Sequence, residues 1–274
     1  MKKTLNLAAA VVLGGTAAYA WRRWGSDKPN PQERDRIGYP PLDTPKPVSA
    51  DVWIVDSGPI SVGGLTIPVR MTVIRLAEGD LLLHSPTQFT SALRAELVQL
   101  GPVRHLVAPT IGHWTFLPDW QKAFPEAEVW AVPGLRDRPQ VRASGLQINH
   151  DLGEKSPPAW EKDIEQGLVH GGGGFKEAFF FHRTSRTLIL ADLVQNLEPS
   201  KLPALTGLVA RLALAARGKT SGHVRAATLL GGESAKESIR RMLSLQPHKV
   251  IFAHGRWFDS KATDRLKRAF EWSV

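Results

Sequence analysis

The first half of the chain alternates apolar runs with amphipathic ones. Residues 51–86 are rich in β-branched side chains and contain the turn sequences SVGG and AEGD, which predicts a meander of strands. A Thr/Ser start and a Gly stop predict a helix over 87–101. Apolar runs at 103–109 and 127–133 predict buried strands on either side of a short helix over 116–125. Strands that alternate with helices indicate an α/β layer.

The second half repeats this scheme in a different order. A strand is predicted over 162–170, and the sequences KEAFFFH and TLILADL around RTSR predict a hairpin over 176–193. Residues 201–247 have helical periodicity, 249–255 form an apolar strand, and a helix with a Ser N-cap is predicted over 260–272. Each half would supply one sheet with helices outside it. The pattern therefore favours an αββα sandwich in which loops from both halves meet at one edge.

The N-terminal segment 1–25 is set apart from this pattern. Its weakly apolar run from Leu5 to Trp21 would span about 26 Å as a helix, close to the thickness of a hydrocarbon core. The Trp and two Arg residues directly after the run favour a single-pass membrane anchor. The sequence AYA, which ends at Ala20, is compatible with a signal peptide as the alternative.

Three regions follow from these patterns. We expect residues 1–25 to be the anchor or signal peptide and residues 26–50, which are rich in Pro and charge, to be an extended linker. Residues 51–274 would form the globular domain. The basic residues that follow the apolar run place this domain on the cytoplasmic side of a membrane, whereas cleavage at Ala20 would place it in the periplasm.

The amino-acid composition limits the kinds of site and partner that the chain can have. The chain has no cysteine, which excludes disulfides, thiolate zinc sites and cysteine nucleophiles. Its formal net charge is +9, so anionic lipid and small anionic molecules are suitable partners. Lys and Arg are dispersed, without a basic run or a basic stripe interleaved with aromatic residues, which argues against nucleic acid.

Four side chains able to bind a metal lie where predicted strands end. His113 follows the strand over 103–109, and His170, Asp192 and His254 close three later strands. Imidazole and carboxylate groups are the usual ligands of Zn, Fe or Mn where Cys is absent. Each residue also has a structural interpretation, such as a turn cap or a hydrogen bond to a carbonyl group.

The chain resembles the metallo-β-lactamase superfamily, which has an αββα fold. The family's first ligand motif, H-x-H-x-D-H, aligns with VAPTIGHWTF so that its last His is His113. The other three motif positions fall on Ala108, Thr110 and Gly112, none of which offers an imidazole or a carboxylate. The family's next ligands align with His170, with Asp192 in LADL and with His254 in AHG.

More closely, the sequence resembles an uncharacterised branch of that superfamily, catalogued as a domain of unknown function. The block HRTSRTLILADL carries most of this similarity, which extends over about 51–272. The resemblance implies one divalent metal, Zn or Fe, held by His113, Asp192 and His254, with His170 as a further candidate. His84 would lie near the pocket. Gly112 stands where the family places the Asp that positions the attacking water, which puts standard hydrolysis in doubt.

Two functional hypotheses follow. The first is a single-metal or degenerate hydrolase in which a metal-activated water attacks a small anionic substrate of unknown identity. The second is a metal-free pseudoenzyme that keeps the fold and binds a ligand or a protein partner near a membrane. Metal content distinguishes them.

Overall fold

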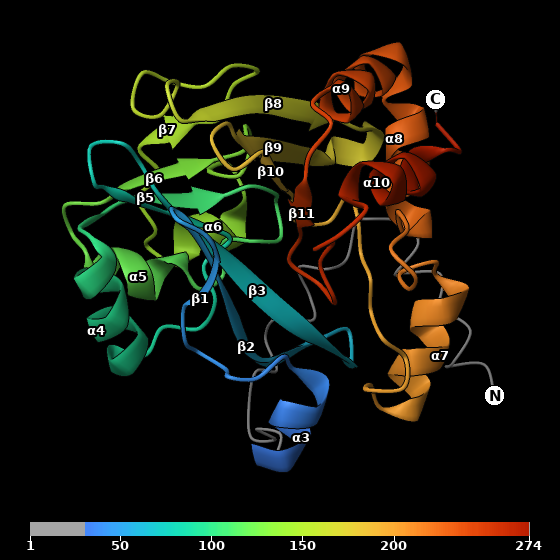
Figure 1. Cartoon of the computed structure of the whole chain (residues 1–274), viewed down its shortest axis with the longest axis horizontal. Coiled ribbons are helices and arrows are strands. Elements are labelled where there is room, and N and C mark those ends of the chain that lie inside the picture. The colour runs from blue at the N-terminus through green and yellow to red at the C-terminus, as the bar shows by residue number, and fades with distance from the viewer. Residues whose placement is uncertain (1–30, 274) are drawn as a thin grey trace.

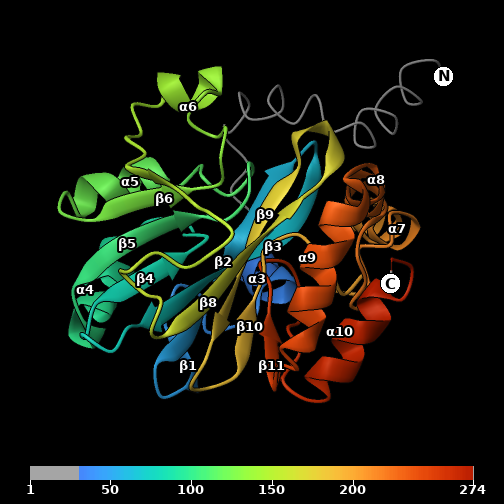
Figure 2. The same cartoon turned by 90° about the horizontal axis from the view of Figure 1, so that it is seen from above.

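The computed structural model describes residues 31–273 (Figure 1). The predicted anchor or signal peptide over 1–25 lies outside the described residues. Within residues 31–273, no helix is both long and apolar enough to cross a membrane. The described chain forms two β-sheets that pack face to face, with helices on both outer sides (Figure 2). The predicted mixed α/β sandwich is therefore confirmed.

The first half of the chain forms a sheet of seven strands in sequence order. Neighbouring strands are antiparallel from β1 to β4 and parallel from β4 to β7. The strands are β1 (Lys46–Ser49), β2 (Val52–Val62), β3 (Leu65–Arg75), β4 (Leu81–His84), β5 (Val103–Ala108), β6 (Glu128–Ala131) and β7 (His150–Asp151).

The second half forms a sheet of four strands in the order β11-β10-β9-β8. β8 pairs antiparallel with β9, β9 antiparallel with β10, and β10 parallel with β11. The strands are β8 (Ile164–His170), β9 (Lys176–His182), β10 (Thr187–Ile189) and β11 (Lys249–Ile251). As expected from the sequence, each half of the chain supplies one sheet.

The helices cover the two outer faces. On one side lie α4 (Ser91–Leu100), α5 (Leu117–Ala123) and α6 (Pro139–Ala143), and on the other lie α8 (Gly222–Leu230), α9 (Gly232–Ser244) and α10 (Ala262–Phe270) (Figure 2). Helix α7 (Ala204–Leu212) stands at the margin beside β3 (Figure 1). A short 3-10 turn, η2 (Gly172–Gly174), links β8 to β9.

The core lies between the two sheets. Side chains of β3 to β6 pack there against the inward face of the second sheet, which contributes Leu168, Phe180 and Ile189. A separate apolar cluster joins the outer face of the second sheet to α9 and α10. Because both faces of the second sheet are covered, its strands are apolar on both sides. This explains the continuous apolar runs FFF and LIL in the sequence.

The prediction of an extended linker over 26–50 is wrong for its described part. Residues 31–37 form helix α3 (Pro31–Ile37), which buries Ile37 completely, and β1 pairs with β2. Lys46 forms an ion pair with Asp56 over 2.6 Å, and the Tyr39 hydroxyl donates to Glu198 over 2.7 Å. A Pro-rich segment is compatible with this position because β1 is an edge strand, where a missing N–H leaves no ladder bond unmade.

Element boundaries differ at the end of the chain. β11 covers only residues 249–251, the first part of the strand predicted over 249–255. α10 begins at Ala262 after Lys261, whose φ of 49° is left-handed, so Ser260 is not its N-cap. α4 begins at Ser91 rather than at 87, and a Thr does cap it, since the Leu93 N–H donates to the Thr90 hydroxyl over 3.1 Å.

Candidate metal centre

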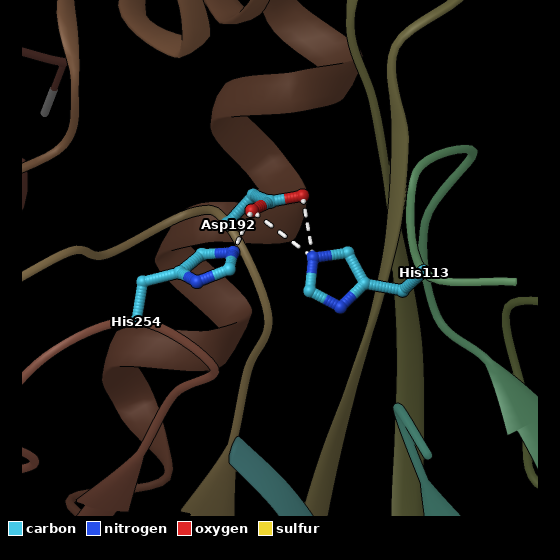
Figure 3. Close-up of side chains that lie close together, drawn as sticks. All are labelled: His113, Asp192 and His254. Atoms are coloured by element: carbon cyan, nitrogen blue, oxygen red, sulfur yellow. Dashed lines mark hydrogen bonds and ion pairs between the residues drawn. The ribbon is translucent and has the colours of Figure 1, made fainter. Parts of the chain in front are cut away.

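Three of the four predicted ligands converge at one edge of the sandwich (Figure 3). His113 lies in the loop after β5, Asp192 follows β10 and His254 follows β11. One ligand atom from each lies within 4.8 Å of the other two. These loops meet because parallel strands of a sheet end at a common edge and the two sheets are stacked. The two halves of the chain thus contribute to the same site.

Each of the two imidazole rings is fixed in orientation by a contact at its Nδ1 atom. His254 Nδ1 donates to the Pro68 carbonyl oxygen over 2.9 Å, and His113 Nδ1 lies 2.6 Å from the Ser85 hydroxyl oxygen. Both Nε2 atoms consequently face Asp192, from which they lie 3.2–3.3 Å away. Metal-binding histidines commonly have this arrangement, in which a second partner fixes the ring and its tautomer.

The donor set fits a divalent cation. Because His254 Nδ1 donates its proton to a carbonyl group, the neutral ring carries a lone pair on Nε2. That lone pair lies 3.3 Å from a carboxylate oxygen of Asp192. Two electron pairs face each other there, an arrangement that a cation between the two groups would stabilise. Two imidazoles and one carboxylate form a recognised set for Zn or Fe(II).

Electrostatics and exposure agree with this interpretation. Burial acts to raise the pKa of Asp192, but the His113 and His254 imidazoles outweigh burial and hold that pKa well below its usual value. The Asp192 side chain keeps 21% of its surface exposed, compared with 12% for His113 and 7% for His254. The carboxylate is therefore ionised and reachable from solvent on one side, as an open coordination position requires.

A second carboxylate, Glu177, shapes the turn that carries Asp192. Glu177 is fully buried on β9 and accepts hydrogen bonds from three consecutive backbone N–H groups, those of Ala191, Asp192 and Leu193, over 2.7–2.9 Å. Burial and the neighbouring Asp192 raise the pKa of Glu177 to about 8. Three donors on one side chain fix the direction in which the Asp192 carboxylate leaves the backbone.

The three motif positions that lack ligands lie beside this cluster or behind it. The Thr110 hydroxyl donates to Asp192 over 3.2 Å and accepts from the Gly112 N–H over 3.2 Å. Ala108 is fully buried at the end of β5. A hydroxyl group that hydrogen-bonds the carboxylate thus stands in the motif, where the superfamily has metal ligands. Among the described residues, His113, Asp192 and His254 form the group that could hold a metal ion.

His170 does not join the cluster formed by the described residues. It ends β8, but its Nε2 lies 2.7 Å from Glu154 and 39% of its side chain is exposed. The strand was predicted correctly, but the side chain turns outward to an acidic neighbour. His84 is 1% exposed and lies edge-on to Phe180, and its Nε2 has no hydrogen-bond partner among residues 31–273.

The sequence-based prediction missed the residues that support the ligands. Ser85, Glu177 and the Pro68 carbonyl act through contacts between distant parts of the chain. Arg70 belongs with them, because its guanidinium donates to the carbonyl oxygens of Phe252 and Gly255, on both sides of His254. The sequence contains one usable signal, a Ser directly after an apolar strand in LLLHSP, where a φ of 57° turns the chain sharply.

The fold is similar to that of solved metallo-β-lactamases. The enzyme from Pontibacter korlensis superposes with a TM-score of 0.56 at 14% identity, covering 83% of this chain and 98% of that one. The enzyme from Hirschia baltica gives 0.54 at 14% identity, over 82% and 96%. The enzyme from Erythrobacter litoralis gives 0.55 at 12% identity, over 83% and 92%. At these identities the likeness shows the fold alone.

A family model gives the relationship at the sequence level. The comparison with curated proteins gave no match. The model of a domain of unknown function, DUF4336, matches residues 50–243, which is more than half of the chain and includes His113 and Asp192. The chain therefore belongs to the DUF4336 family, whose domain has the metallo-β-lactamase fold in this protein.

Proposed function

We propose that this protein is a metal-dependent hydrolase that holds one divalent cation, Zn or Fe, with His113, Asp192 and His254. The observation that carries the proposal is the convergence of these three groups within 4.8 Å, with both histidines oriented through Nδ1. A cation bound there would supply Lewis-acid activation of water or of a substrate oxygen. The net charge of +9 supports a small anionic substrate.

The chain's own residues would orient the three ligand side chains and exclude water from them. Ser85 and the Pro68 carbonyl hold the two rings, and Glu177 holds the turn of Asp192. Thr110 donates to the Asp192 oxygen Oδ2, which leaves fewer lone pairs of this carboxylate free for other partners. Gly112 provides no general base at the position where the family motif has Asp.

The alternative is a metal-free pseudoenzyme that binds a ligand or a protein partner. Its support is the loss of three motif ligands at Ala108, Thr110 and Gly112, together with the outward orientation of His170. The two proposals differ in one measurable property, the affinity for a metal.

Metal content tests the proposal. Full-length protein purified without chelator, before and after incubation with Zn, Fe or Mn, should contain close to one equivalent of metal by elemental analysis. H254A and D192N should lose most of it. H170A is the matched control, since it removes a strand-end histidine outside the cluster, and it should bind metal like the wild type. A ratio near zero in the wild type under all these conditions would establish the pseudoenzyme instead.

A further inference from the structure

Helix α7 presents an apolar face to solvent. Leu205, Leu208 and Leu212 are 66%, 53% and 76% exposed, and Leu214, just beyond the helix, is 37% exposed. The spacing of three and four residues places the three helical leucines on one face. Isolated exposed leucines are ordinary, but a continuous stripe on one helix indicates an interaction surface. We call these four residues the α7 leucine face.

The orientation of α7 is fixed by its opposite side. Thr206, Gly207 and Ala210 are buried, and the Thr206 hydroxyl accepts a hydrogen bond from the Thr66 N–H on β3 over 3.3 Å. A Cβ at Gly207 would lie 2.8 Å from the Pro199 carbonyl oxygen, so this side approaches the body closely. The small residues thus hold the helix down, and the leucines cannot turn inward without breaking these contacts.

Unpaired cations border the leucine face. Arg211 on α7 and Arg217 in the following loop are both exposed. Within residues 31–273, neither forms an ion pair with an acidic side chain, whereas other exposed arginines do, as in Arg136–Asp151 and Arg240–Glu233. Helix α7 itself, ALTGLVARL, contains no acidic residue. The surface therefore combines aliphatic side chains with uncompensated positive charge.

We propose that the α7 leucine face docks onto an anionic membrane surface, with the leucines at the headgroup boundary and Arg211 and Arg217 against lipid phosphates. An exposed helix with Leu on one side and Arg at its border has the composition of interfacial helices. Charge complementarity favours anionic lipid, to which the whole chain, at +9, is also attracted. The apolar run from Leu5 to Trp21, at the other end of the linear sequence, is a second feature suited to lipid. This contact is independent of the proposed metal chemistry.

A fluorescent label placed on α7 tests the contact in the full-length chain. Because the chain has no cysteine, L208C gives a single site for an environment-sensitive dye. The dye then reports on the surroundings of α7 and not on those of residues 1–25. V98C on α4 is the matched control, since Val98 is also exposed, at 46%, and α4 lies on the opposite side of the molecule (Figure 1). With vesicles of phosphatidylcholine and phosphatidylglycerol, the dye at 208 should shift to the blue and the dye at 98 should not.

Charge variants test the arginines. R211Q/R217Q should raise the vesicle concentration at half-maximal shift at least fivefold. R104Q/R142Q, which removes two exposed arginines from the other half of the molecule, should leave it unchanged. The proposal is overturned if the dye at 208 does not respond, if both dyes respond equally, or if pure phosphatidylcholine gives the same shift. A shift that grows with protein concentration in the absence of vesicles would also overturn it, and would assign the face to a second copy of the chain.

Discussion

At the scale of single residues, the support of Asp192 rests on Glu177. An amide in its place keeps one acceptor oxygen but adds an NH2 group that only donates, so at least one of the three backbone N–H groups would lose its partner. We expect E177Q to lower the free energy of unfolding by about 1–3 kcal/mol and to weaken metal binding. Urea denaturation and metal titration measure the two effects. E154Q, at an exposed carboxylate, is the control, and equal stability of both variants would contradict the assigned role.

His105 gives a prediction about pH. It is 8% exposed on β5, where its Nδ1 accepts from the Trp130 indole N–H over 3.3 Å, and burial lowers its pKa. The unfolded chain therefore takes up a proton at this residue before the folded chain does. The free energy of unfolding therefore falls as pH drops below about 6.5, the pKa of His in the unfolded chain, by up to about 1.4 kcal/mol per pH unit.

A substitution at His105 isolates the contribution of this residue to the pH dependence of stability. H105N keeps an acceptor near the indole without a group that titrates in this range. It should lose less stability than the wild type between pH 7 and pH 5, as followed by urea denaturation at each pH. If H105N and the wild type lose the same amount, protonation of His105 is not linked to folding.

The residues that were predictable share one property, a place at the end of an apolar strand. His113, Asp192 and His254 all follow runs whose pattern is visible in the sequence, so the edge at which they meet could be inferred. A strand end fixes that edge but not the direction of a side chain, which is why His170 was assigned to the site and instead contacts Glu154. The Pro68 carbonyl lies 186 residues from His254 in sequence, and no local pattern indicates that contact.

At the scale of elements, the turn after β11 depends on an arginine in another sheet. Arg70 on β3 is buried, pairs with Asp56 over 2.6 Å and donates to the carbonyl oxygens of Phe252 and Gly255. Replacement by Met would leave two carbonyl groups and much of a buried carboxylate without partners. Breaking a buried ion pair costs about 3–5 kcal/mol, and the His254 turn should loosen with it.

The comparison with a surface pair makes this testable. R75M removes an arginine from the same strand whose partner, Asp51, is 35% exposed, so it should cost about 1 kcal/mol or less. We expect R70M to reduce both thermal stability and metal affinity by far more than R75M. Similar losses in the two variants would show that the Arg70 contacts do not support the site.

Elements that form because of their own sequence pattern were predicted well. Elements that form because of contacts with distant residues were predicted poorly. The sandwich strands and α4 needed only hydrophobic periodicity and a cap. The segment over 31–50 was misjudged because its order comes from Lys46 meeting Asp56 and Tyr39 meeting Glu198. Helix α7 lies in the region of predicted helical periodicity, yet its small side is buried and its leucines are exposed, because β3 and Pro199 lie too close for large side chains.

At the scale of the whole molecule, the fold persists at 12–14% identity to the metallo-β-lactamases. What this chain shares with them is the fold. In this chain an order of apolar strands and amphipathic helices is sufficient to build two stacked sheets with a common edge. The fold does not determine which side chains lie at that edge. Fold alone therefore does not assign the reaction, which has to be argued from the three groups present at the site.

The last prediction concerns residues 1–25, which we propose anchor the body to a membrane. A run of this length and composition can bury its surface in lipid, while the described body has a complete core of its own. Gly14 and Gly15 would cost about 1 kcal/mol each relative to Ala in a helix, but a bilayer tolerates them because the backbone must pair internally there. Untagged full-length protein should sediment with membranes and be released by detergent, whereas a chain without residues 1–25 should be released far more readily, retained only by contacts such as the α7 leucine face. Full-length protein that is soluble at its uncleaved mass would contradict the anchor, and a soluble form shortened after Ala20 would establish the signal peptide and a periplasmic body.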